Sequence, residues 1–168
     1  MMNTQTKLLD GKIVASTITT KIKASINSLR EKKKKIPSLT VILVGNDPAS
    51  HIYVKNKEKT SNAIGIESKV LKLPDSIKED DLTKIINGLN TDKSIDGILV
   101  QLPLPKHIRT QAIIEAIDPR KDVDGLHPYN LGRLMSGNIN LAPCTPLGII
   151  EILKHYGYIL KGTSTVIV

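Results

Sequence analysis

The chain has 168 residues, 40% of them hydrophobic, a formal net charge of +8 and one cysteine. This length suits one domain, or one domain and part of another, and a single cysteine excludes an intrachain disulfide or a multi-cysteine metal site. No apolar run approaches the roughly 20 residues of a membrane span, and residues 1–12 lack a signal-peptide core, so we expect a soluble, cytoplasmic protein without a membrane partner.

The first predicted helix covers about 12–34, because four apolar residues recur there at helical spacing. These residues are Ile18, Ile22, Ile26 and Leu29. Pro37 ends the helix, and the apolar run 39–44 then predicts a short buried strand.

The second predicted helix has clear start and stop signals. Asp47 is a suitable N-cap, and Pro48 fits the first helical position. The helix is expected to run to Ile64, where Gly65 supplies a left-handed C-terminal residue.

Two more strands and two more helices continue the alternation. Strands are predicted at 69–73 and 95–100, and a helix between them is expected to start at the capping box Ser76–Glu79. Its apolar stripe consists of Leu82, Ile85, Ile86 and Leu89. A short helix is predicted at 110–117. This order predicts an α/β domain of three layers, with a parallel sheet covered by helices on both faces.

The pattern changes after Pro119, where turn residues and carboxylates become frequent. A short helix is predicted over 130–135. Another is expected to open with Thr145 as its N-cap and Pro146 at its first position, and to end near Tyr156.

Residues 163–168 read as the beginning of a new strand. We therefore expect two units: a first domain over 1–125, and a connecting segment with the first strand of an incomplete second domain over 126–168.

One polar residue is expected at the carboxyl end of a buried strand. Gln101 directly follows the apolar run 98–100, and Pro103 and Pro105 prevent the strand or a helix from continuing. Ligands of open α/β sheets bind at this edge, and a primary amide suits the rim of a heteroaromatic ring because it offers a donor beside an acceptor.

Tyr53 and Lys57 lie four residues apart on the second predicted helix and therefore share a face. A lysine acts as an acid or base near neutral pH only where burial or nearby cations favour the neutral amine. Taken alone, this spacing fits an ordinary solvated helix face better, and the neighbouring Lys55 and Lys59 favour that interpretation.

Asp122 and Asp124 lie two residues apart in a turn-rich segment, and a turn is the simplest role for them. A single carboxylate near Gln101 would suit the N–H groups of a nitrogen heterocycle. No metal site is expected, because the four histidines lack ligand spacing. Cys144 lies between prolines without an obvious histidine base, which favours a packed, unreactive thiol.

The positive charge is expected to lie on a solvated surface. The cationic run Lys32–Lys35 has no interleaved aromatic residues and lies where a helix should end. We therefore expect no nucleic-acid partner.

Taken together, five segments resemble the FolD family of bifunctional methylenetetrahydrofolate dehydrogenase/methenyltetrahydrofolate cyclohydrolase. The segments appear in the order and spacing of that family and span nearly the whole chain. They are 44–50 with Tyr53 and Lys57, Gly65–Ile66, 97–105, 121–125, and 143–146 with Gly148.

The resemblance implies a role for each matching residue. Lys57 matches the lysine that handles the proton in the cyclohydrolase step, and Tyr53 the tyrosine that stacks near the folate ring. Gln101 matches a glutamine that hydrogen-bonds close to that lysine. Asp124 matches the carboxylate that holds the pterin edge, and Ser50 a serine near the site.

The resemblance further implies one-carbon metabolism, which supplies purine, histidine and methionine biosynthesis, and a homodimer that binds tetrahydrofolate derivatives. In the implied chemistry, a hydride passes from methylenetetrahydrofolate to NADP, and water then opens the methenyl product to formyltetrahydrofolate. A cationic methenyl substrate disfavours a second positive charge nearby and so favours the neutral form of Lys57.

The chain departs from the family in one respect. The strand that begins near Thr163 opens a Rossmann-type NAD(P) domain in the family, and a glycine-containing phosphate loop follows it. This chain contains no Gly-x-Gly-x-x-Gly, and dinucleotide phosphates need such a loop. We therefore expect the chain to bind NADP poorly and not to run the dehydrogenase.

Three alternatives remain at this point. The chain is either a non-catalytic remnant, an anion- or nucleic-acid-binding module driven by its lysines, or a relative with dehydrogenase activity only. Lys57 and Gln101 argue against the last, because they match the cyclohydrolase site.

Overall fold

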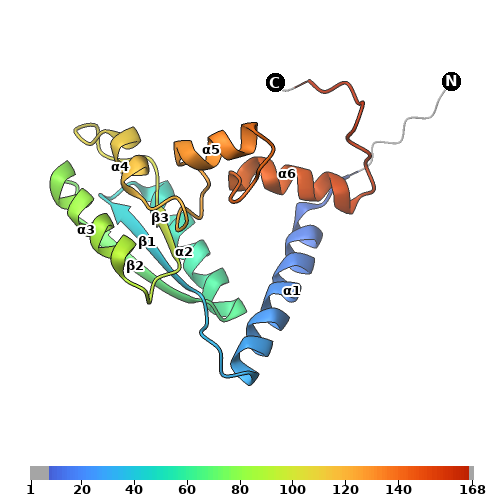
Figure 1. Cartoon of the computed structure of the whole chain (residues 1–168), viewed down its shortest axis with the longest axis horizontal. Helices are drawn as coiled ribbons and strands as arrows, with labels where there is room; N and C mark the ends of the chain where they lie inside the picture. The colour runs from blue at the N-terminus through green and yellow to red at the C-terminus, as the bar shows by residue number, and fades with distance from the viewer. Residues whose placement is uncertain (1–7, 167–168) are drawn as a thin grey trace.

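A computed structural model gives the structure of the chain and describes residues 8–166. Helices and strands alternate along the first two thirds of the chain, and helices alone follow (Figure 1). The elements are α1 (Gly11–Glu31), β1 (Ser38–Val44), α2 (Pro48–Ile64), β2 (Glu67–Leu73), α3 (Glu79–Thr91), β3 (Gly97–Val100), α4 (Thr110–Ala116), α5 (Pro128–Met135) and α6 (Cys144–His155).

The three strands form one parallel sheet in the order β2-β1-β3. In the register of the sheet, Leu39 pairs with Gly97 and Ile42 with Val100. A single parallel bridge between Ile98 and Asp122 adds one more contact on the outer side of β3. The predicted parallel α/β sheet is confirmed, and the carboxyl ends of all three strands meet at one edge.

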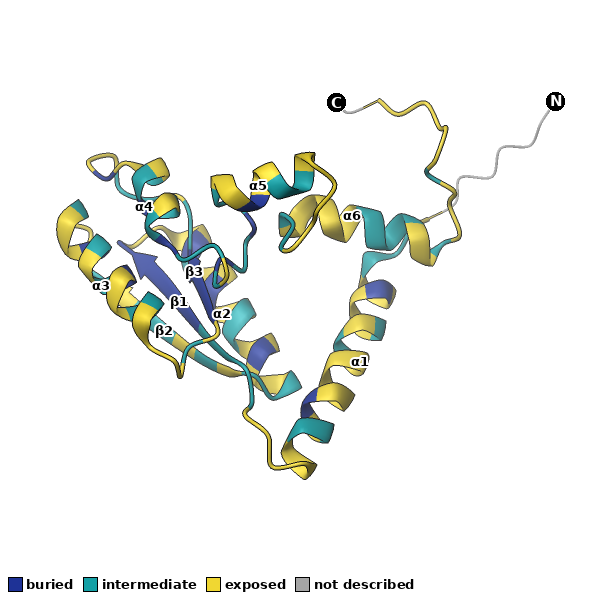
Figure 2. Ribbon diagram, in the orientation of Figure 1, coloured by how far each residue is buried: buried dark blue, intermediate teal, exposed yellow. Residues whose placement is uncertain are grey.

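Helices cover both faces of the sheet, as predicted. The alternation of side chains along β1 separates the two cores, because successive residues point to opposite faces. Ile42 packs with Leu82 and Ile86 of α3, whereas Val41 packs with Val54 of α2. In Figure 2 the buried strands β1 and β3 lie between these helix layers.

The ends of α2 match the prediction, whereas two other predicted caps are wrong. Asp47 caps α2 through the Ser50 N–H, and Gly65 adopts a left-handed φ of 91°. In α3 the predicted Ser76 cap is replaced by Lys78, without a side-chain hydrogen bond. The Glu79 side chain, which the capping box would direct back to the helix start, instead accepts hydrogen bonds from Arg109 of the next connection.

The N-terminus of α6 also differs from the prediction. This helix begins at Cys144 with Pro143 at the N-cap position, so Thr145 lies inside the first turn and does not cap it. Its predicted end near Tyr156 is correct.

The first helix is less buried than its apolar periodicity predicted. It ends at Glu31 rather than near residue 34, and only Val14 and Ile26 are buried, whereas Ile18 and Ile22 are each 37% exposed. The physical reason is its position: α1 extends away from the sheet, toward α6 and the far end of α2, and covers neither face (Figure 1).

The strand predicted at 163–168 is not found in the described part of that segment. Residues 163–166 are irregular and exposed, because no strand lies beside them to complete a ladder, and residues 167–168 lie outside the described range. Within residues 8–166, no helix is both long and apolar enough to cross a bilayer.

Candidate active site at the carboxyl end of the sheet

The predicted site residues gather at the edge where the strands end. Ser50, Tyr53 and Lys57 lie on α2, which starts just after β1. Gln101 directly follows β3, and its backbone N–H donates to Ile42 O of β1 at 2.9 Å. The prediction that Gln101 ends a buried strand is therefore confirmed.

The Lys57 side chain donates a hydrogen bond to the Gln101 side-chain oxygen, with 3.1 Å between Nζ and Oε1. The Gln101 amide nitrogen in turn donates to Leu102 O at 2.7 Å. Because both ends of the amide are engaged, its oxygen is held toward Lys57. Lys57 itself is half-buried.

Asp124 lies in the loop that follows the bridge to β3 and interacts electrostatically with Lys57. Burial raises the pKa of the Asp124 carboxyl above its ordinary value; Lys57 opposes this shift, and the neighbouring Asp122 adds to it. The site thus holds an amine, an amide and a carboxyl group close to one another, which are suitable for proton transfer and for holding the N–H edge of a ring.

Ser50 and Tyr53 differ sharply in exposure. Ser50 is 2% exposed, and its hydroxyl lies 3.5 Å from Leu102 O, so it packs α2 against the turn after Gln101. Tyr53 is 60% exposed and lies one helical turn before Lys57. Its ring is therefore open to solvent.

Sequence reasoning missed two residues behind the site. Asp122 is 2% exposed, and Asn130 of α5 is fully buried against it. For Asp122, the acid pair ahead of Gly125 indicated a turn but not burial. For Asn130, no sequence signal distinguished this residue from the other polar residues of a short helix.

Cys144 is exposed, so the predicted packed thiol is wrong in its location. Its thiol donates to Val123 O at 3.3 Å, one residue before Asp124. Partial burial raises the pKa of the Cys144 thiol, and the Asp124 and Asp122 carboxylates raise it further, against the opposing effect of Lys57. A raised pKa disfavours the reactive thiolate.

Two further features bear on ligands. Among residues 8–166, no group of three or more His, Cys, Asp or Glu side chains converges in a way that would hold a metal ion.

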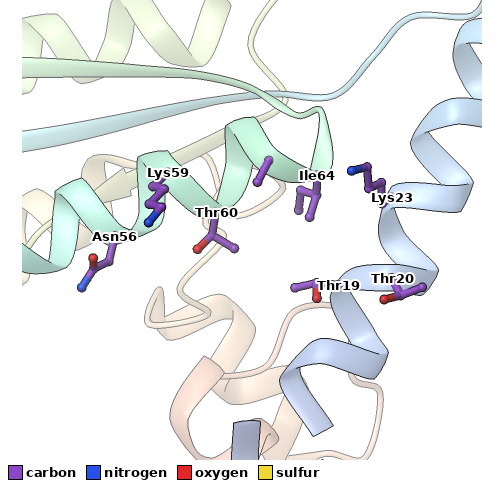
Figure 3. A pocket seen from close by; sticks show the side chains of 8 residues that line it. Thr19, Thr20, Lys23, Asn56, Lys59, Thr60 and Ile64 are labelled. Carbon is purple, nitrogen blue, oxygen red and sulfur yellow. The ribbon is translucent and has the colours of Figure 1, made fainter. Parts of the chain in front are cut away.

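An open groove of about 470 Å³ lies between α1 and the C-terminal half of α2. Its lining includes Lys23, Lys59 and Thr60 but none of the five predicted site residues (Figure 3).

The chain matches a family model described as "Tetrahydrofolate dehydrogenase/cyclohydrolase, catalytic domain" over residues 9–124. Among curated relatives, it is 51% identical to the bifunctional protein FolD of Nitratiruptor sp. over 162 residues, which is 96% of this chain and 57% of the relative. It is 48% identical to bifunctional protein FolD of Streptococcus pyogenes over 163 residues, or 97% of this chain and 57% of that relative.

Solved structures agree with this match. The bifunctional FolD of Campylobacter jejuni has a TM-score of 0.86 and 46% identity, covering 89% of this chain and 53% of that one. The Trypanosoma brucei enzyme, solved with NADP and an inhibitor, has a TM-score of 0.87 and 32% identity, covering 93% of this chain and 54% of its own. The chain thus spans about 57% of the length of these curated relatives.

Proposed function

This chain belongs to the tetrahydrofolate dehydrogenase/cyclohydrolase family, and from that premise we propose that its site binds methenyltetrahydrofolate and hydrolyses it to formyltetrahydrofolate. The observation that carries the proposal is the 3.1 Å contact between Lys57 Nζ and Gln101 Oε1, close to the Asp124 carboxyl. The proposal takes the Lys57 amine as proton acceptor, the Gln101 amide as the group that orients it, and the Asp124 carboxyl as the group that binds the ring; the contact at this edge of the sheet supports these roles.

In the proposed reaction, the oxygen of water bonds to the cationic methenyl carbon and gives up one proton. One of the two C–N bonds of that carbon then breaks, the remaining hydroxyl proton is replaced by a C=O double bond as the released nitrogen takes up a proton, and the five-membered ring opens. The Lys57 amine takes a proton from the attacking water, which prevents positive charge from building up on the oxygen. Gln101 accepts one N–H of that amine, so that the lone pair of the neutral amine is directed away from the amide. A cationic substrate favours this neutral form, because two positive charges repel each other.

The remaining residues bind the substrate in this proposal. Asp124 accepts hydrogen bonds from the N–H groups of the pterin edge, since a carboxylate offers two acceptor oxygens side by side. The exposed ring of Tyr53 stacks on the folate, and Ser50 supports the turn at Leu102. Each role rests on the resemblance together with the position of the residue.

The proposed activity of the whole enzyme includes oxidation of methylenetetrahydrofolate with NADP. A dinucleotide needs a glycine-rich turn at a helix N-terminus. The sequence contains no Gly-x-Gly-x-x-Gly, and the described residues after α6, 156–166, form no helix. These residues do not fit the cofactor, so we assign none of them to NADP and derive no step through it.

Family resemblance alone supports three further parts of the proposal. They are a role in one-carbon metabolism that feeds purine, histidine and methionine biosynthesis, a homodimeric assembly, and a cytoplasmic location. Sedimentation of the purified chain would test the dimer directly.

The proposed function is tested by the decay of methenyltetrahydrofolate in the presence of the 168-residue chain, because this step consumes no NADP. We expect decay above the buffer rate that Lys57→Gln abolishes and that Lys55→Gln retains. Lys55 is a matched control, since it is an exposed lysine on the same helix. Decay at the buffer rate, or full activity of Lys57→Gln, would contradict the proposal.

A further inference from the structure

A buried carboxylate lies behind the candidate site. Asp122 is 2% exposed and accepts three hydrogen bonds. Its Oδ1 accepts from Gly125 N at 3.1 Å, and its Oδ2 from His127 N at 2.8 Å and from Asn130 Nδ2 at 2.9 Å. These donors lie on both sides of Leu126, so one side chain holds the whole turn from residue 122 to residue 127.

Asn130 connects this carboxylate to α5. Its side chain is fully buried, and Nδ2 donates both to Asp122 Oδ2 and to Pro119 O, each at 2.9 Å. His127 caps the same helix, because its Nδ1 accepts the Tyr129 N–H at 3.0 Å. The first turn of α5 is therefore fixed to the segment that carries Asp124.

The same turn is fixed to the sheet and to α6. On the sheet side, Ile98 N donates to Lys121 O at 2.7 Å and Val123 N donates to Ile98 O at 3.4 Å. On the other side, Gly125 has a φ of +67°, and a Cβ there would lie 2.5 Å from the Ala142 carbonyl carbon. The Cys144 thiol donates to Val123 O at 3.3 Å. Asp124 is thus the residue that these contacts surround.

We propose that Asp122 is a positioning residue: with Asn130 it holds the 122–127 turn in the one conformation that presents Asp124 beside Lys57, without itself touching the substrate. The functional part of this inference rests on the proposed folate site. A carboxylate is required because three donors converge on it. Asparagine offers one oxygen and would direct an N–H₂ group at one of these donors, so at least one of the three hydrogen bonds to this side chain is lost.

The chain contains its own reporter of this turn. Cys144 is its single cysteine, and its thiol contacts the carbonyl one residue before Asp124. The thiol is exposed and reacts with a disulfide reagent in the folded chain, and we expect it to react faster when movement of the turn removes its contact with Val123 O. The rate of this labelling is compared at neutral pH, where the protonated thiol keeps its hydrogen bond to Val123 O. Because Asp122→Asn also removes a charge that raises the thiol pKa, Asn130→Ala, which keeps that charge, is the decisive variant.

We expect Asp122→Asn and Asn130→Ala each to accelerate this labelling several-fold. Asp96→Asn is the matched control, because Asp96 also accepts a backbone N–H, that of Ser38, but at the opposite end of the sheet. Asn130→Ala keeps the buried charge and serves as the second variant if Asp122→Asn does not fold. Unchanged labelling in a folded variant would overturn the inference.

The second measurement is a double-mutant cycle on binding of tetrahydrofolate. We expect Asp122→Asn alone to weaken affinity by about tenfold, the scale of a lost hydrogen bond to a charged group. In an Asp124→Asn background the same change should have little further effect, since Asp122 acts through Asp124. A merely structural role would weaken binding equally in both backgrounds.

The two measurements separate the possible failures. If the parent chain does not bind tetrahydrofolate, the proposed function fails, while the labelling rates still decide whether Asp122 holds the turn. If the parent binds and the two Asp122→Asn effects are equal, the positioning role is wrong and the proposed function stands.

Discussion

Lys57 and Gln101 lie 44 residues apart in the chain, and their side chains meet at 3.1 Å between Nζ and Oε1. This contact joins α2, which follows the central strand, to the end of the neighbouring strand β3. It exists because parallel strands bring all their carboxyl ends to one edge, which is where open α/β sheets bind ligands.

Replacement of Gln101 tests this contact. Gln101→Leu removes the acceptor from the amine, and we expect methenyltetrahydrofolate turnover to fall by roughly tenfold to a hundredfold, in the range of general acid–base contributions. Gln101→Glu retains an acceptor but adds a carboxylate, which stabilises the ammonium form, so that activity should return only at higher pH. The pH–rate profiles of both variants provide the measurement. An unchanged profile for Gln101→Glu would contradict this role.

Asp124→Asn should stabilise the fold at neutral pH. Burial raises the pKa of Asp124 in the folded chain, so ionisation of this group costs stability as pH rises above its unfolded value of about 3.9. Asp124→Asn has no group to ionise, so its free energy of unfolding should exceed that of the parent increasingly as pH rises above about 3.9. Below about pH 3.5 the stability difference between the two should be constant, without this gain. Thermal unfolding at pH 3.5 and pH 7 checks the difference. Equal shifts at both values would show that ionisation is not the cause.

Asp47→Ala should destabilise α2 and hence the position of Lys57. The Ser50 N–H donates to the Asp47 carboxylate at 2.7 Å, and this bond lowers the pKa of that carboxyl. A lowered pKa means that the stabilisation is present above the unfolded value of about 3.9 and is lost as pH falls through the folded value. Urea unfolding at pH 7 and pH 3 measures this. Asp47→Asn, which can still cap, should lose less at pH 7.

Ile86→Ala should destabilise the domain by about 2–5 kcal/mol, because it removes a fully buried side chain from the core between α3 and the sheet. Ile22→Ala is the matched control on α1, where the side chain is 37% exposed. Ile22→Ala should lower the free energy of unfolding clearly less than Ile86→Ala does, since Ile22 buries less apolar surface in the folded chain. Denaturant unfolding of both variants gives the comparison, and equal costs would mean that α1 is packed as tightly as the core.

The sequence was sufficient for the scaffold wherever local chemistry decided the outcome. Asp47, Pro48 and Gly65 define α2, because a cap, a fixed φ and a left-handed residue each act within one turn. Gln101 was placed at a strand end because two prolines follow it closely. These signals are local and independent of tertiary packing.

Tertiary contacts decided the features that the sequence did not predict. The apolar stripe of α1 predicted burial, but no layer of the sheet is available to cover Ile18 and Ile22. The Glu79 side chain does not form the predicted capping box and instead accepts a hydrogen bond from Arg109, which lies 30 residues away at the start of α4. The burial of Asp122 depends on Asn130, which lies eight residues further along the chain in α5, and no local pattern indicates that pair.

The order of strands also has a consequence for how the site comes into being during folding. Leu39 of β1 pairs with Gly97 of β3, and α2, β2 and α3 all lie between them in the chain. Such non-local pairing forms late, because a long loop must close before the contact stabilises it. A nascent chain that has completed α2 therefore holds the Lys57 amine without its acceptor, and the site appears only when β3 docks.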